Sequence, residues 1–213
     1  MQLITSFDLK KSEYLSKDRF ISYHHQLRLI FSLGNKVNHI LEIGIYNSLL
    51  TEVLKRNGYE VTTADIDPHL NPDITLDLAA DFSLPEDKFD AIVLFQVLEH
   101  LPYEQSEKAL RKLAQATNKY LVISLPQNTL YMSMQVRVSD VPRSRYLSLQ
   151  IPKFWSTKPI SDKHYWEVGL KGYPKKRILT SIINAGLTIK KEFIDPVNPY
   201  HYFLVLEKTI SKN

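Results

Sequence analysis

The sequence predicts an α/β fold: a doubly wound, mostly parallel seven-stranded sheet whose last strand is antiparallel. Short apolar runs, typical of buried strands, alternate with amphipathic segments, typical of helices, and this alternation indicates βαβ units and a parallel sheet. Only about seven residues, 195–201, join the last two strands. A parallel crossover needs about a dozen residues or more, so the last strand is expected to run antiparallel to the one before it.

The first half of the chain predicts two helices and four strands. A loose apolar stripe indicates an amphipathic helix over residues 17–31, which Gly34 and Asn35 end. A second helix, capped by Asn47, runs to residue 57. The strands are expected at 37–43, 59–64, 74–77 and 89–95.

The second half predicts helices at 103–117 and 174–185 and strands at 120–125, 187–194 and 202–207. An irregular stretch, 126–172, separates the fifth strand from the last helix and contains much of the proline and aromatic content. We interpret residues 1–213 as a single domain, with an N-terminal helix at 17–31 and an inserted lid at 126–172.

Composition narrows the function classes. The chain has 213 residues, of which 44% are apolar and 23% charged, as in an ordinary globular domain. It contains no cysteine, which excludes disulfides and thiolate chemistry. The first residues match no targeting peptide, and no apolar run reaches membrane-spanning length, so we expect a cytoplasmic protein without membrane insertion.

A glycine and a carboxylate follow the first two predicted strands. Gly44 ends the first strand and Asp65 the second, a spacing that suits a ligand turn and a ribose-binding acid. Tyr46 and Ser48 stand where a dinucleotide fingerprint needs close backbone approach, which disfavours a pyrophosphate. The spacing alone favours this ligand-binding interpretation no more than the alternative, in which Gly44 is a turn at the end of a strand and Asp65 is an acidic residue of a loop. Asp67, before a proline, is interpreted as a turn residue or helix cap.

Six segments of the sequence favour the ligand-binding interpretation of Gly44 and Asp65. They are HILEIG (39–44), VTTADIDPHLNPD (61–73), FDAIVLFQVLEHLP (89–102), KYLVISLP (119–126), HYWEVG (164–169) and NPYHYFLVLEK (198–208). In this order they resemble class I S-adenosylmethionine-dependent methyltransferases, in particular a bacterial and archaeal group of the broad small-molecule type. The resemblance implies a Rossmann-like methyltransferase fold and S-adenosylmethionine as cofactor. Tyr46 and Ser48 depart from the family, which usually has glycines there.

The resemblance also implies which residues contact the cofactor. Those at its methionine end are Glu42 and Gly44; those at its ribose and adenine are Asp65, Ile66, Asp77 and Leu78; those that close the pocket are Phe95 and Gln96.

Four residues are candidates for catalysis: Glu99, His100, His164 and His201. One helical turn would present Gln96, Glu99 and His100 together. The segment 96–100 resembles the Glu-Val-x-Glu-His pattern of metal-assisted O-methyltransferases, with Gln96 in place of the first Glu. We interpret Glu99 and His100 as organising the strand-to-helix turn or contacting substrate. An amide is a poorer ligand for hard cations than a carboxylate, so Gln96 leads us to expect no metal. Either His164 or His201 could take a proton from an acceptor.

The stretch 126–172 leaves the carboxyl end of a strand, on the ligand face. Its basic residues, interleaved with aromatic ones, are Arg137, Arg143, Arg145, Lys153 and Lys158. They favour a lid over a small, anionic acceptor; a solvated loop is the alternative. The predicted function is O- or N-methylation of a small molecule. The alternatives are a non-catalytic S-adenosylmethionine-binding protein and an RNA methyltransferase.

Overall fold

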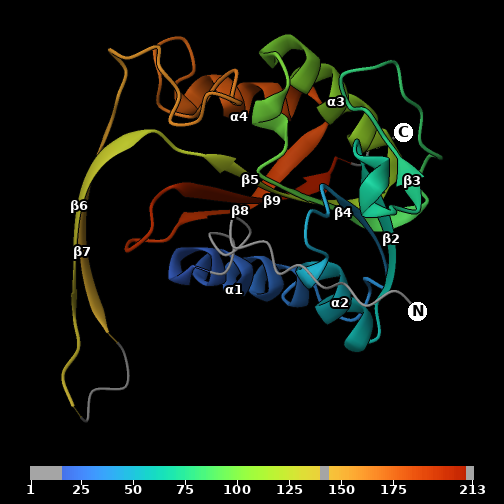
Figure 1. Cartoon of the computed structure of the whole chain (residues 1–213), viewed down its shortest axis with the longest axis horizontal. Coiled ribbons are helices and arrows are strands. Elements are labelled where there is room, and N and C mark those ends of the chain that lie inside the picture. The colour runs from blue at the N-terminus through green and yellow to red at the C-terminus, as the bar shows by residue number, and fades with distance from the viewer. Residues whose placement is uncertain (1–15, 140–143, 210–213) are drawn as a thin grey trace.

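A seven-stranded sheet organises the part of the chain that this computed structural model describes, residues 16–139 and 144–209 (Figure 1). Its strands are β1 (His39–Ile43), β2 (Glu60–Asp65), β3 (Ile74–Thr75), β4 (Phe89–Phe95), β5 (Thr117–Pro126), β8 (Leu187–Ile194) and β9 (His201–Lys208). They lie in the order β3-β2-β1-β4-β5-β9-β8. The chain order reverses between β1 and β4, and their carboxyl ends mark the place where open α/β sheets bind ligands.

The strand directions confirm the predicted fold class. β1 pairs in parallel with β2 and β4, and β3 and β5 extend the parallel sheet on either side. β9 lies antiparallel between β5 and β8. The short connection after β8 therefore reversed the last strand as predicted, while its insertion beside β5 was not foreseen.

Helices cover both faces of the sheet, α1 and α2 on one and α3 and α4 on the other (Figure 1). Their bounds are α1 Lys17–Phe31, α2 Leu49–Arg56, α3 Tyr103–Ala116 and α4 Lys175–Asn184. Leu29 and Leu54 pack in the core beneath the first pair, and Leu113 and Ile182 in the core beneath the second. None of the helices within the described ranges has the length and apolar character needed to span a bilayer.

Most predicted bounds are close to those observed. α1, β4 and β8 match the predicted ranges. β3 is shorter than expected, ending at Thr75, and the Asp77 carboxylate instead accepts a hydrogen bond from the Ala79 amide in a turn (2.8 Å). Two short 3₁₀ helices, η2 (Pro68–Leu70) and η3 (Leu98–His100), follow β2 and β4.

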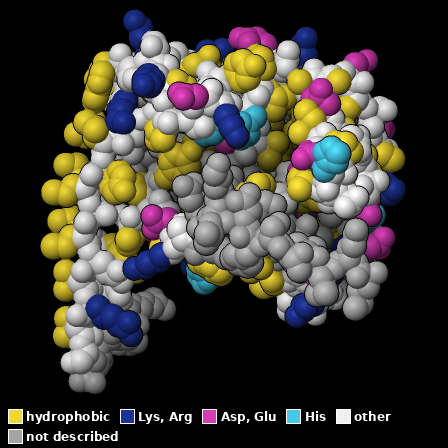
Figure 2. Space-filling model, viewed as in Figure 1, with side chains coloured by type: hydrophobic (Ala, Val, Ile, Leu, Met, Phe, Trp, Pro, Cys, Tyr) yellow, Lys and Arg dark blue, Asp and Glu magenta, His cyan; other side chains and the backbone are white. Residues whose placement is uncertain are grey.

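The prediction of an irregular stretch at 126–172 was wrong for its first half. Strands β6 (Thr129–Val136) and β7 (Arg145–Pro152) form an antiparallel hairpin that stands away from the main sheet (Figure 1). Cross-strand pairs place the apolar residues of both strands on one face, for example Met132 opposite Leu149 and Met134 opposite Leu147. This apolar face is exposed along the outer edge of the arm (Figure 2).

Candidate functional site

A glycine turn leaves the carboxyl end of β1. Gly44 has φ +85°, a left-handed conformation that side chains disfavour. A Cβ atom at this position would lie 2.7 Å from Cγ2 of Val97, so the turn has no room for one. The Gly44 amide donates to the Ala64 carbonyl at 2.9 Å. The turn therefore requires glycine for two independent reasons.

The loop after Gly44 keeps the same kind of backbone without glycines. Tyr46 and Ser48 have φ of 36° and 57°, so they adopt conformations that glycine accommodates more easily. Ser48, not Asn47, is the N-cap of α2 and makes no side-chain capping bond. The Asn47 Oδ1 instead accepts from the Leu49 amide and from the Tyr23 hydroxyl, both at 3.2 Å, and so links the loop to α1.

Asp65 connects the end of β2 to this loop. Its Oδ2 accepts from the Ile45 amide (2.9 Å) and its Oδ1 from the Asp67 amide (3.0 Å). Asp67 accepts from the His69 amide at 2.9 Å and caps η2, which confirms its predicted role in a turn. A carboxylate oxygen has two acceptor sites, so each oxygen of Asp65 retains capacity for a further donor.

A cleft open to solvent lies over the glycine turn. Predicted cofactor residues that line it are Glu42, Gly44, Phe95 and Gln96. The other four do not line it: Asp65 and Ile66 at the end of β2, and Asp77 and Leu78 beyond β3. Ile66 is 64% exposed and Leu78 is buried in the core.

Glu42 lies buried at the base of the cleft. The Thr51 hydroxyl donates to its Oε2 at 2.6 Å. Burial raises the pKa of the Glu42 carboxyl to about 7, although the bond from Thr51 and the charge of Lys55 both oppose that rise. The carboxyl is therefore able to change its protonation state near neutral pH.

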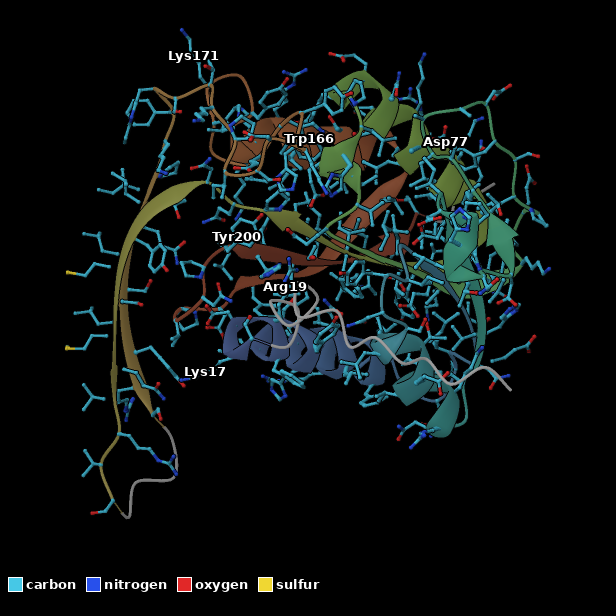
Figure 3. All side chains as sticks on the ribbon, viewed as in Figure 1. Lys17, Arg19, Asp77, Trp166, Lys171 and Tyr200 are labelled. Carbon is cyan, nitrogen blue, oxygen red and sulfur yellow. The ribbon has the colours of Figure 1, made fainter. Side chains whose placement is uncertain are left out.

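The helix α1 contributes a wall of the cleft that sequence reasoning missed. Its lining residues are Arg19, Ser22, Tyr23 and Gln26. Figure 3 shows Arg19 directed from α1 towards the sheet. The charge of Arg19 opposes the rise in the pKa of Glu99 that burial causes, and it contributes to the low pKa of His201, so Arg19 lies near both groups. Nothing in the amphipathic pattern of α1 distinguished these residues from an ordinary solvent-facing side.

The predicted helical turn over Gln96, Glu99 and His100 is wrong. Gln96 has φ +58°, and the 3₁₀ helix begins only at Leu98, because the chain turns sharply after β4. Gln96 bonds to β5 instead: its amide N–H donates to the Ser124 carbonyl at 3.0 Å and its side chain to the Ser124 hydroxyl at 3.2 Å.

The structure brings His164 to Glu99 and His100. One donor atom from each of the three lies within 4.8 Å of the others. Glu99 is fully buried, and burial raises its pKa to about 8. His100 and His164 make an edge-to-face contact, with ring centres 4.9 Å apart. Three of the four predicted catalytic residues therefore form one cluster.

His201, the fourth, lies apart in an aromatic environment. It begins β9, is 4% exposed and stacks on Phe203. Burial, together with smaller contributions from Arg19 and His25, lowers its pKa to about 3. The imidazole is neutral at pH 7 and is a weak proton acceptor.

Of the basic residues predicted for the lid, the four that the structure describes do not line the cleft: Arg137, Arg145, Lys153 and Lys158. Arg137 follows β6 and Arg145 begins β7, so both lie at the outer end of the hairpin. Arg143 lies outside the described residues. The second half of the stretch returns to the body, where Trp166 is buried and donates from Nε1 to the Leu101 carbonyl at 3.1 Å.

Comparison with known proteins agrees with this geometry. Residues 16–162 match the model of a family described as a methyltransferase domain, and the chain belongs to that family. No curated protein matches the sequence. Family and fold together place the chain among class I S-adenosylmethionine-dependent methyltransferases, as the motifs predicted.

Solved structures share the fold at low identity. The magnesium protoporphyrin IX methyltransferase of Synechocystis PCC 6803 with bound SAM has a TM-score of 0.60 and 14% identity, covering 98% of this chain and 87% of that one. The N-methyltransferase NodS of Bradyrhizobium japonicum WM9, in complex with S-adenosyl-L-homocysteine, has 0.61 and 17%, covering 96% and 93%. The sugar N-methyltransferase KedS8 of Streptoalloteichus sp ATCC 53650 has 0.60 and 13%, covering 99% and 95%.

Proposed function

We propose that this protein transfers the methyl group of S-adenosylmethionine to an oxygen or nitrogen atom of a small, anionic molecule. The observation that carries the proposal is the cleft at the switch point, where the Gly44 turn and the buried Glu42 meet α1. The related structures crystallised with S-adenosylmethionine or S-adenosylhomocysteine support the choice of cofactor.

Each end of the cofactor has a matching feature in the proposed site. The methionine end lies over Gly44, with the Glu42 carboxyl beneath it. The ribose hydroxyls donate to Asp65, whose oxygens each have one backbone donor already and an acceptor site to spare. The adenine lies against Ile66, an exposed apolar side chain directly after that carboxylate. The cofactor has no phosphate, so the loop needs no further glycines for close approach.

The acceptor is proposed to enter between α1 and the cluster of Glu99, His100 and His164. Arg19 lines the cleft and lies close enough to this cluster for its charge to act on Glu99. Its guanidinium is the cation that supports an anionic acceptor, because Arg137 and Arg145 lie on the arm. A guanidinium binds carboxylate and phosphate groups well, since it donates in a planar fork.

Methyl transfer to this acceptor would be an in-line displacement. The sulfonium is already an activated electrophile, so the protein's main tasks are to align the two reactants and exclude water. An oxygen or nitrogen nucleophile loses a proton during the reaction. We assign the removal of this proton to the cluster of Glu99, His100 and His164 and not to His201, whose low pKa makes it a weak base.

The test is turnover with a panel of alcohols, phenols, amines and their anionic derivatives, measured as S-adenosylhomocysteine released. Product formation that depends on the acceptor, and that Asp65→Ala reduces, is the expected result. Tight binding of S-adenosylhomocysteine without turnover on the panel or on an extract of the native host would instead indicate a non-catalytic cofactor-binding protein. Turnover only with RNA, with salt-sensitive binding, would indicate an RNA methyltransferase.

A further inference from the structure

Three side chains with metal-binding chemistry converge after the carboxyl end of β4. Glu99 and His100 belong to η3, after β4, and His164 comes from the loop that returns from the hairpin arm. A carboxylate oxygen of Glu99 and one ring nitrogen of each histidine all lie within 4.8 Å of one another. Segments far apart in the sequence therefore supply one compact set of donors.

Glu99 is the unusual member of this set. Its side chain is fully buried, and neither carboxylate oxygen has a hydrogen-bond partner on any other of the described residues. A buried polar group without a partner costs free energy, and a charged one costs more. The carboxyl is therefore arranged for a partner that the described protein groups do not provide.

Both histidines are oriented by their other ring nitrogen. Nδ1 of His100 lies 3.1 Å from the Lys163 carbonyl oxygen, which can only accept, so Nδ1 carries the proton. Nδ1 of His164 lies 2.7 Å from Oε1 of Glu167 and donates to that carboxylate. In each ring Nε2 is then the atom with the free lone pair, the arrangement that metal-binding histidines adopt.

Glu167 is itself firmly positioned. Its side chain is 0% exposed and accepts from the Ile160 amide at 2.9 Å and from the Asn128 side chain at 2.7 Å. These bonds fix the ring of His164, whose side chain is only 7% exposed. A carboxylate that orients a histidine in this way is a common outer partner of a metal ligand.

We propose that Glu99, His100 and His164 bind a divalent transition-metal cation of the zinc class. Two imidazole nitrogens and one carboxylate oxygen form the three-residue set of many open zinc sites and suit zinc, iron and cobalt better than magnesium. Zinc bonds of about 2.0–2.1 Å place neighbouring donors roughly 3.4 Å apart. Donors within 4.8 Å of one another would have to approach by at most about 1.4 Å to reach that spacing.

This proposal departs from the expectation of no metal, which rested on Gln96. The structure directs the Gln96 side chain to Ser124 and supplies His164 as the third donor.

Three protein ligands leave at least one coordination position for water or substrate. An acceptor hydroxyl bound there would have a lower pKa, because the cation stabilises its conjugate base. This role for the cation rests on the proposed methyl transfer. Binding of the cation does not, since it depends only on the three donors.

The experiment measures metal binding and needs no methyl acceptor. Full-length protein freed of metal with a chelator is titrated with Co²⁺, followed by visible absorption, and with Zn²⁺ and Mg²⁺, followed by calorimetry. We expect one Zn²⁺ or Co²⁺ per chain, an absorption band typical of a tetrahedral or five-coordinate site, and much weaker Mg²⁺ binding. Binding of Mg²⁺ as tight as that of Zn²⁺ would overturn the zinc-class assignment.

Variants identify the donors. Glu99→Gln and His100→Asn should each lower Zn²⁺ affinity by more than 100-fold, and Glu167→Gln, which alters only the orientation of His164, by about 10–100-fold. His69→Asn, on the exposed η2, is the matched control and should bind as the wild type does. Circular dichroism verifies that each variant is folded. Wild-type affinity in folded Glu99→Gln and His100→Asn, or no stoichiometric binding by the wild type, would refute the site.

Discussion

Lowering the pH from 7 to 5 should destabilise the protein through His201. The ring is 4% exposed, its Nδ1 has no hydrogen-bond partner among the described residues, and its pKa is about 3. In the unfolded chain a histidine has its ordinary pKa of about 6.5. Because the folded-state pKa is the lower one, the unfolded state takes up the proton first. The contribution of the neutral His201 ring to the free energy of unfolding is fully present above about pH 6.5 and is lost as the pH falls towards 3.

The size of the effect follows from these two pKa values. At pH 5 about 30 unfolded molecules carry the proton on this residue for each one that does not, while the folded ring stays neutral. The free energy of unfolding should therefore fall by about 2 kcal/mol between pH 7 and pH 5 from this group alone. This figure already includes the effects of Arg19 and His25, which contribute to the low pKa of the ring.

Urea unfolding at pH 7, 6 and 5 tests this for the wild type and for His201→Phe. Phenylalanine preserves an aromatic ring against Phe203 but cannot take up a proton. Titration of the other groups is common to both proteins, so the wild type should lose about 2 kcal/mol more than the variant over this range. Equal losses in the two proteins would refute the reasoning and would reopen His201 as a proton acceptor.

Three further predictions concern the proposed cofactor site around Gly44, Tyr46 and Asp65. Asp65→Ala should weaken S-adenosylhomocysteine binding by about one to three powers of ten, because charge-assisted hydrogen bonds to the ribose are lost. Asp67→Ala, the control, should change the affinity little. Calorimetric titration measures both, and equal effects of the two substitutions would contradict the assignment of the ribose to Asp65. Gly44→Ala should lower the midpoint temperature of thermal unfolding, since φ is +85° and the new Cβ would lie 2.7 Å from Cγ2 of Val97. Adding Val97→Ala should recover part of that decrease. If it recovers none, the contact with Val97 is not a cause. Tyr46→Gly should leave affinity unchanged or improve it, and a marked loss in the same titration would show that the ring contacts the cofactor.

The sequence by itself determined the elements whose pattern is local. The periodicity of residues 17–31 and the apolar run 89–95 each predicted one element with its observed bounds, because burial of one face or of both imposes those patterns. The length of the connection after β8 determined the direction of β9, since a short link cannot make a parallel crossover. Gly44 and Asp65 were identifiable because strand ends in such a sheet converge on one edge.

The hairpin arm shows where local reasoning failed. Alternation in residues 129–136 is a strand pattern, but prolines and aromatic residues on either side obscured it. Its partner strand begins only at Arg145, so the pairing that fixes both strands is not local. The arm carries Arg137 and Arg145 to its outer end, a position that composition alone could not reveal.

Only the tertiary structure decided how the candidate site is assembled. The sequence predicted α1 as an amphipathic helix without a role for Arg19 or Tyr23, and packing of that helix beside the β1 turn makes both residues part of the cleft. His164 meets Glu99 because the chain returns from the arm and the Tyr165 amide donates to the Glu99 carbonyl at 2.9 Å. Periodicity specifies which face of a segment is buried, but contacts between distant segments depend on how those faces pack together, and only coordinates contain that information.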